Sequence, residues 1–160
     1  MAKYHMQKSE CEITDPDIIE EIITRGKFLT LALCRRDEPY ILTLDYGYDT
    51  VAHCMYFHSA KRGLKLDILK ENSAVCGTII EDNGYNEKAC THAYRTLVFT
   101  GSIEVLKTLE EKKAGIEVML KHLAEEPDTM RKRLLARGET YNNIVVLRLK
   151  IDEITGKEGY

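Results

Sequence analysis

The sequence lacks any apolar run that approaches the roughly 20 residues needed to cross a bilayer. Its first residues, Met1 to Glu12, are polar and contain no apolar core of a signal peptide. It also lacks an excess of basic residues, because the formal net charge is −3 and the isoelectric point is near 6.0. We therefore expect a cytoplasmic protein that has neither a membrane nor a nucleic acid as its partner.

Several common catalytic signatures are absent as well. The chain contains no glycine-rich dinucleotide fingerprint, no phosphate-binding P-loop, no Gly-x-Ser-x-Gly elbow and no internal repeat. Strands and helices also do not alternate throughout, as they would in a doubly wound sheet. These absences argue against a nucleotide-binding α/β fold and against a serine hydrolase.

The five cysteines are an odd number, which argues against a complete set of disulfides. Cys34, Cys54 and Cys76 lie in apolar, strand-like segments, so we predict reduced thiols within the core. The pairs His53-Cys54 and Cys90-Thr91-His92 combine metal-ligating residue types without the paired spacing of a zinc site. No metal centre is expected, and a redox role for the loop residue Cys90 stays open.

The 160 residues predict one domain, residues 1–160, with a loose N-terminal segment over residues 1–12. Helices are predicted between Asp15-Pro16 and Gly26, from Ser59 to Asn72, and from Thr108 to Ala136 with an interruption at Glu126-Pro127. A polar loop with a turn at Asn83-Gly84 is expected over residues 82–89, and Gly101 is expected to mark a bulge or close approach. Six strands are predicted, at residues 27–34, 40–46, 54–58, 74–81, 92–106 and 144–151. The fold class is therefore mainly β with flanking helices, a small six-stranded antiparallel barrel.

The predicted helix that follows the third strand begins with an unusual set of charges. Ser59 is a good N-cap residue, yet Lys61, Arg62 and Lys65 occupy the first turns, where acidic residues are favoured. A phosphate bound by the free N–H groups, with Ser59 donating and Lys65 or Arg62 neutralising it, would account for this placement. The alternative is that the three basic side chains simply point into water.

Three segments together carry a resemblance to a known family. They are Tyr40-Ile41-Leu42-Thr43-Leu44-Asp45-Tyr46-Gly47-Tyr48-Asp49, Tyr56-Phe57-His58-Ser59-Ala60 and Gly63-Leu64-Lys65-Leu66-Asp67. This combination resembles the FMN-binding split barrel of the pyridoxamine 5′-phosphate oxidase-like superfamily, in its nitroimidazole-resistance reductase branch. The likeness extends from Asp15 to the ending Ile154-Thr155-Gly156-Lys157, which is typical of that branch.

The resemblance implies a homodimer that binds FMN at each of two sites on the subunit interface. Carried over to this sequence, the phosphate would meet Ser59, Lys65 and Arg62, the flavin ring would lie along Leu42, Thr43 and Leu44, and the backbone of His58 and Ala60 would border the cofactor. The position of the ring is physically reasonable, because an edge strand offers N–H and C=O groups at regular intervals.

In this family the partner subunit closes the flavin site through a long strand, here residues 92–98. Tyr94 could pack on the flavin or the substrate and Thr96 could hydrogen-bond it, although Tyr94 could equally be an ordinary strand residue. His92 and Arg95 are further candidates for recognising a polar substrate. The branch often has proline at the position of Thr43, and tryptophan and serine at those of Tyr94 and Thr96, which leaves the substrate pocket open.

The implied function is that of a nitroreductase-like, FMN-dependent oxidoreductase that reduces a nitroaromatic or quinone-like acceptor through flavin N5, with NADH or NADPH as candidate electron donors. His58 is the candidate proton donor, because histidine changes charge near neutral pH; the alternative is a structural histidine. Two other functions stay open: a flavin-binding carrier or sensor, and a split barrel that binds haem or deazaflavin. Pyridoxamine 5′-phosphate oxidation itself is not expected, because the arginine-rich C-terminal substrate segment is missing.

Overall fold

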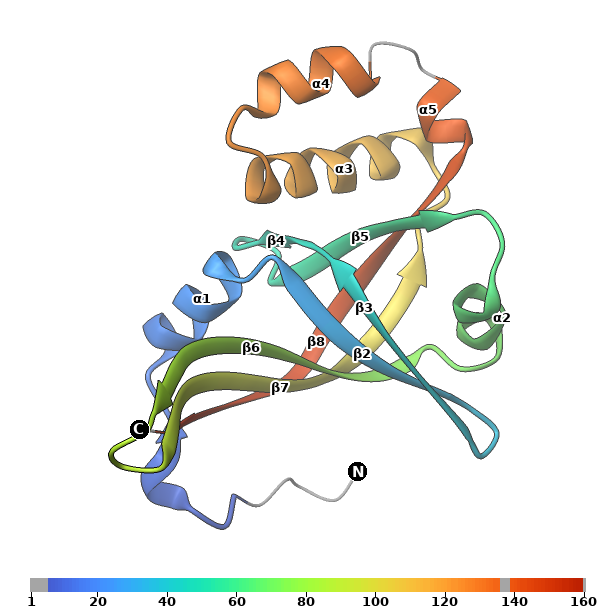
Figure 1. Cartoon of the computed structure of the whole chain (residues 1–160). Coiled ribbons are helices and arrows are strands. Elements are labelled where there is room, and N and C mark those ends of the chain that lie inside the picture. Colours follow the sequence, from blue (N-terminus) through green and yellow to red (C-terminus); the bar gives the residue numbers. More distant parts are fainter. Residues whose placement is uncertain (1–5, 136–138, 160) are drawn as a thin grey trace.

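The computed structural model describes residues 6–135 and 139–159, which form one antiparallel sheet with helices around it (Figure 1). The strands are β1 (Glu12–Ile13), β2 (Phe28–Arg35), β3 (Glu38–Asp45), β4 (Gly47–Asp49), β5 (Cys54–Ala60), β6 (Ala74–Asn86), β7 (Thr91–Val105) and β8 (Ile144–Gly159). The helices are the 3-10 helix η1 (Ser9–Cys11) and the α-helices α1 (Pro16–Arg25), α2 (Leu64–Glu71), α3 (Leu109–Leu123), α4 (Pro127–Leu135) and α5 (Glu139–Asn142).

The strand order is β3-β2-β6-β7-β8-β5-β4, and β1 pairs with β8. Within the described residues β3 and β4 do not pair with each other, so the sheet forms an open, split barrel. The predicted fold class, mainly β with flanking helices, is confirmed. The predicted number of six strands is wrong, because the sheet has eight. The two additional strands, β1 and β4, have only two and three residues, too short to show an alternating pattern.

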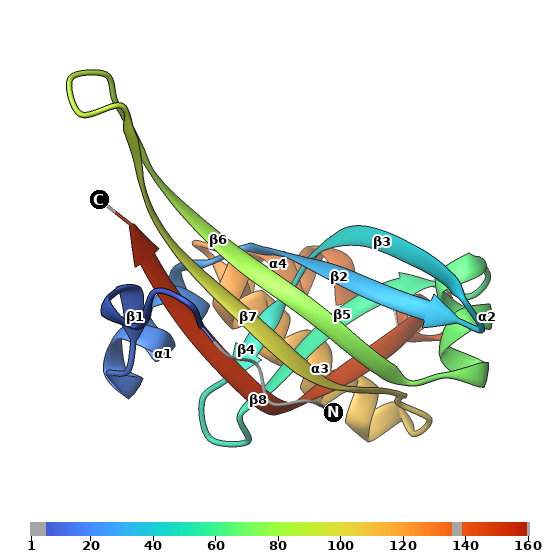
Figure 2. The ribbon, with the colours of Figure 1, turned by 90° about the horizontal axis from the view of Figure 1, so that it is seen from below.

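The hairpin of β6 and β7 is longer than predicted and projects beyond the barrel (Figure 2). The loop expected over residues 82–89 is largely strand, because β6 continues to Asn86 across a register shift between Asp82 and Tyr85. Gly84 absorbs this irregularity with a φ of 90°. Strand β8 likewise continues past residue 151, since β7 pairs with it as far as Gly159.

Close packing explains the glycine inside β7. A register shift with β8 lies between Thr100 and Gly101, and a Cβ atom at Gly101 would come within 2.1 Å of the carbonyl oxygen of Lys150. Only glycine allows the two strands to approach so closely. The predicted role of Gly101 is confirmed.

Helix α1 forms as its local sequence predicts. The side chain of Asp15 accepts a hydrogen bond from the amide of Asp17 at 2.9 Å, Pro16 occupies the first turn, and Gly26 follows the last residue. Ile22 and Ile23 are buried against the barrel. Elsewhere the core consists of inward-facing side chains of the strands, notably Leu29, Leu31, Met55, Phe57, Leu97, Phe99, Leu147 and Leu149.

Helices α3, α4 and α5 lie together on one side of the sheet, next to β4 and β5 (Figure 1). Two glycines permit this contact. A Cβ at Gly47 in β4 would lie 2.5 Å from the Cα of Met119, and one at Gly115 in α3 would lie 2.8 Å from the Tyr56 ring. The predicted interruption at Glu126-Pro127 is confirmed, because α3 ends before it and α4 begins at Pro127. The predicted helix end at Ala136 lies outside the described residues.

Two of the cysteine predictions are wrong. Cys54 is buried, and burial raises the pKa of its thiol, but Cys34 and Cys76 are exposed on the outer face of β2 and β6. Both faces of these strands carry small or apolar residues, so the sequence did not distinguish the inner face from the outer one. Residues 9–12 of the predicted loose N-terminal segment form η1 and the start of β1. No helix in the described part of the chain is long and apolar enough to span a membrane.

Candidate functional site

Strand β3 is an edge strand, as predicted. In the described structure its only sheet neighbour is β2, so its other edge has no strand partner. Leu42 and Leu44 are half-buried there, whereas Thr43 is exposed, with its hydroxyl oxygen 3.0 Å from that of Thr30. This edge can therefore offer main-chain donors and acceptors to a ligand.

Strand β5 presents alternate residues to opposite sides. His58 and Ala60 are exposed, while Phe57 and Ser59 are buried. Ser59 is only 5% exposed, and its hydroxyl donates to the carbonyl oxygen of Ala60 at 3.1 Å. Of the candidate site residues His58 and Ser59, only His58 therefore has a side chain that is available to a ligand.

The prediction that Ser59 caps the following helix is wrong. Ser59 lies within β5, which pairs with β8 as far as Ala60 and Ile144. The helix α2 begins at Leu64, and its N-cap residue is Gly63 with a φ of 144°. Sheet pairing extends the strand beyond the position at which the local sequence favours a cap.

The basic residues gather just before and within the first turn of α2. Lys61 and Arg62 are exposed and Lys65 is half-buried. Among the residues that the structure describes, none of these three, which we call the basic cluster, forms an ion pair or hydrogen bond. Three cations near a helix N-terminus, free of internal partners, can neutralise an anionic group such as a phosphate.

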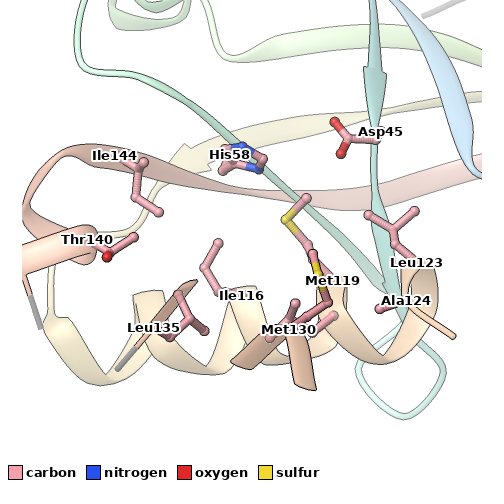
Figure 3. A pocket seen from close by; sticks show the side chains of 11 residues that line it. Asp45, His58, Ile116, Met119, Leu123, Ala124, Met130, Leu135, Thr140 and Ile144 are labelled. Atoms are coloured by element: carbon pink, nitrogen blue, oxygen red, sulfur yellow. The ribbon is translucent and has the colours of Figure 1, made fainter. Parts of the chain in front are cut away.

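A cavity of about 550 Å³ lies between α3, α4, α5 and the adjacent strands (Figure 3). Asp45 and His58 line it from the sheet side, and Thr140 lines it from α5. The remaining lining residues are apolar or small: Ile116, Met119, Leu120, Leu123, Ala124, Met130, Leu135 and Ile144. Since Asp45 directly follows Leu44, and Ala60 follows His58 by two residues, the cavity adjoins the edge strand and β5.

An ion pair attaches the outer wall of this cavity to α3. Arg131 of α4 donates to the two carboxylate oxygens of Glu117 in α3 at 2.9 and 2.5 Å. This guanidinium holds the pKa of Glu117 below its usual range. The bidentate geometry links α4 to α3.

The predicted residues Tyr94 and Thr96 lie on the outer face of β7, which is separated from β3 by β2 and β6. They are thus not brought to Leu42–Leu44 within one chain. The same outer face contains two rows of paired residues across β3, β2, β6 and β7 without a charged side chain. One row is Thr43, Thr30, Thr78 and Val98, and the next is Ile41, Ala32, Cys76 and Thr100. We call these eight residues the uncharged sheet face.

His92 and Arg95 have partners within the chain. Arg95 donates to Glu81 at 2.8 and 2.9 Å and to Glu21 at 3.2 Å, and these carboxylates raise the pKa of its guanidinium. The Nε2 atom of His92 lies 2.7 Å from a carboxylate oxygen of Asp82. Both side chains are therefore engaged in stabilising the β6–β7 hairpin and its contact with α1.

Sequence reasoning missed Asp45 and the apolar lining of the cavity. The helical spacing of Ile116, Met119, Leu120 and Leu123 was visible, but it indicates only an apolar helix face. Whether such a face meets another layer closely or leaves a cavity depends on where α4 is held, and this is a tertiary property.

Comparison with known families decides the classification. A family model described as pyridoxamine 5′-phosphate oxidase matches residues 15–158. The chain belongs to the pyridoxamine 5′-phosphate oxidase family. This membership confirms the superfamily expected from the sequence. No match was found among curated proteins.

Several solved structures share this fold. A protein of Bacteroides thetaiotaomicron named for 5-nitroimidazole antibiotic resistance is 23% identical with a TM-score of 0.77, over 92% of this chain and 86% of that protein. The flavocytochrome Anf3 of Azotobacter vinelandii is 14% identical with a TM-score of 0.82, over 98% and 73%. The FAD and haem binding protein of Mycobacterium smegmatis is 16% identical with a TM-score of 0.75, over 92% and 73%. At these identities the likeness concerns the fold.

Proposed function

We propose that this member of the pyridoxamine 5′-phosphate oxidase family binds FMN and acts as an oxidoreductase on a small molecule. The observation that carries the proposal is the basic cluster, whose three cations follow β5 directly and have no partner among the described residues. A phosphate at this position would account for their placement. Structures with the same fold include proteins named for flavin or haem binding.

The residues present are suited to FMN. Arg62 and Lys65 would neutralise the phosphate, the free edge of β3 along Leu42, Thr43 and Leu44 would hydrogen-bond the ring, and the backbone of His58 and Ala60 would border it. Ser59 would contribute through its main chain, because its hydroxyl is buried and already bonded to Ala60. When bound, FMN supplies hydride or electron transfer at its N5 atom.

The protein would orient the acceptor, exclude water and supply a proton. The cavity beside His58 is walled mainly by apolar side chains of α3 and α4, which would shield a bound acceptor from water. The His58 imidazole lines this cavity and has no hydrogen bond to the described chain. It would therefore be available to supply a proton to a bound acceptor.

A homodimer would complete the site. The uncharged sheet face includes Ile41, which is 70% exposed, and Val98, which is 38% exposed. Apolar exposure of this kind marks a surface suited to a partner, and a second copy would bring its own Tyr94 and Thr96 to the flavin.

The test is reoxidation of the flavoprotein under anaerobic conditions. FMN-loaded protein is reduced with dithionite, or with NADH or NADPH, and then mixed with a nitroaromatic or a quinone in a stopped-flow instrument. An oxidoreductase returns the oxidised flavin spectrum faster than free reduced FMN does at the same concentration. A rate no faster than that of free FMN would instead favour a flavin carrier or sensor.

A further inference from the structure

We propose that the cavity between α3, α4 and the sheet is the acceptor pocket, and that it selects uncharged or cationic aromatic molecules over anionic ones. This assignment rests on the proposed oxidoreductase function for the identity of its occupant. It adds a substrate class and a residue, Asp45, to which neither the family match nor the sequence motifs assign a role.

The size and lining of the cavity are those of a small-molecule site. Its volume of about 550 Å³ lies within the roughly 300–1,000 Å³ of typical ligand pockets. Met119 and Met130 face it from α3 and α4 (Figure 3), and thioether side chains adapt to flat rings and attract their edges. A planar, apolar ring is therefore the favoured occupant.

The polar groups of the cavity are concentrated on its sheet side. Asp45 is half-buried at the end of β3, and it has no cationic partner and no hydrogen-bond donor in the described part of the chain. A carboxylate at the wall of an apolar cavity repels a carboxylate or phosphate on the ligand and attracts an ammonium group or a hydroxyl donor. His58, on the same side, can donate to or accept from an uncharged ligand.

The basic cluster and Asp45 favour ligands of opposite charge. The basic cluster beyond Ala60 is suited to an anion, whereas the cavity that begins at Asp45 and His58 disfavours one. A phosphate-bearing cofactor and an uncharged or cationic acceptor would thus be held at adjoining sites without exchanging places.

The experiment uses three compounds with one ring and three charges: 1-naphthylmethylamine, 1-naphthylmethanol and 1-naphthoate. Each is titrated into the purified full-length protein, loaded with FMN, by isothermal titration calorimetry. The amine and the alcohol bind at least about tenfold more tightly than the carboxylate, because only the carboxylate meets a like charge. In Asp45→Asn the amine loses its advantage over the carboxylate.

Two alanine-to-phenylalanine substitutions, one within α3 and one directly after it, test where the three compounds bind. Ala124 lines the cavity and is half-buried, so Ala124→Phe occupies part of the space and weakens binding of all three compounds. Ala114 is exposed in α3 and does not line the cavity, so Ala114→Phe leaves binding unchanged. Thermal unfolding of each variant establishes that it is folded, and the Asp45→Asn result stands independently of the filling variant.

Equal affinity for the amine and the carboxylate, undiminished binding to folded Ala124→Phe, or release of FMN by the ring compounds would overturn this assignment. FMN content is measured by absorbance in the same samples. FMN binding without ring binding would overturn the pocket alone, whereas ring binding by a protein that never retains FMN would overturn the proposed function.

Discussion

The hydroxyl of Tyr46 donates a 2.6 Å hydrogen bond to the carbonyl oxygen of Ile23, near the end of α1. Tyr46 is fully buried and stands between β3 and β4, where the chain passes from one edge of the split sheet to the other. Burial raises the pKa of this hydroxyl, which therefore stays protonated and able to donate. The bond ties α1 to the crossover that positions β3 and Asp45.

Removing this bond should destabilise the fold. Tyr46→Phe leaves the ring in place but deprives the Ile23 carbonyl of its donor, so the free energy of unfolding should fall by about 1–3 kcal/mol in urea titrations. Tyr85→Phe is the control, because Tyr85 is 59% exposed. Equal stabilities of the two variants would contradict the role given to Tyr46.

His122 should make stability depend on pH. Its Nε2 atom lies 2.6 Å from the carbonyl oxygen of Gly26, and burial, with the nearby charge of Lys27, lowers its pKa below the ordinary value of 6.5. Below about pH 6.5 the unfolded chain therefore binds a proton that the folded chain does not, and the free energy of unfolding decreases as the solution is acidified.

The measurement compares wild type and His122→Gln in urea at about pH 7.5 and about pH 5.5. The variant should lose less stability than the wild type on acidification. The paired carboxylates Glu21 and Glu117 have lowered pKa values, below the ordinary 4.5, so they lose their stabilising contribution only at lower pH. Identical losses in both proteins would show that His122 does not carry the effect.

Two lysines on α2 provide a matched test of the phosphate assignment. Lys65→Ala should weaken FMN binding by roughly 10- to 100-fold, because a charge-assisted contact is lost. Lys70→Ala should have little effect, since Lys70 is at the other end of the helix and already pairs with Asp67 at 2.9 Å. Fluorescence quenching of FMN measures both affinities, and unchanged binding by Lys65→Ala would remove this assignment.

A charge placed in the uncharged sheet face should separate the proposed homodimer. Val98→Asp would put a carboxylate at the β7 end of that face. Light scattering after gel filtration should then report a monomer, and fluorescence quenching should report weaker FMN binding. Val51→Asp is the matched control, because Val51 is 89% exposed in the turn before β5. A wild-type protein that is already monomeric would contradict the homodimer.

The sequence correctly predicted those elements whose signals lie in a few neighbouring residues. Helix α1 follows from Asp15, Pro16 and Gly26, and the glycine in β7 follows from its strand context. The start of α2 was misplaced, because pairing of Ser59 and Ala60 with β8 overrides the local preference of serine for a cap. Propensity is a weak guide where tertiary pairing competes with it.

The candidate site likewise has parts that the sequence predicted and parts that it did not. The basic cluster and the edge strand were visible in the sequence because each depends on consecutive residues. The cavity was not, since it combines Asp45, His58 and Thr140 with a helix pair that Arg131 and Glu117 hold together. The exposure of Cys34 and Cys76 was also hidden, because an outer sheet face without charges resembles a buried one.

The most direct test of the central claim is the visible absorption spectrum of the purified protein, followed by release and identification of any chromophore. The account predicts flavin bands, either as purified or after addition of FMN, and FMN as the released compound. A protein that stays colourless and does not quench the fluorescence of added FMN, or one that shows haem bands alone, would contradict it.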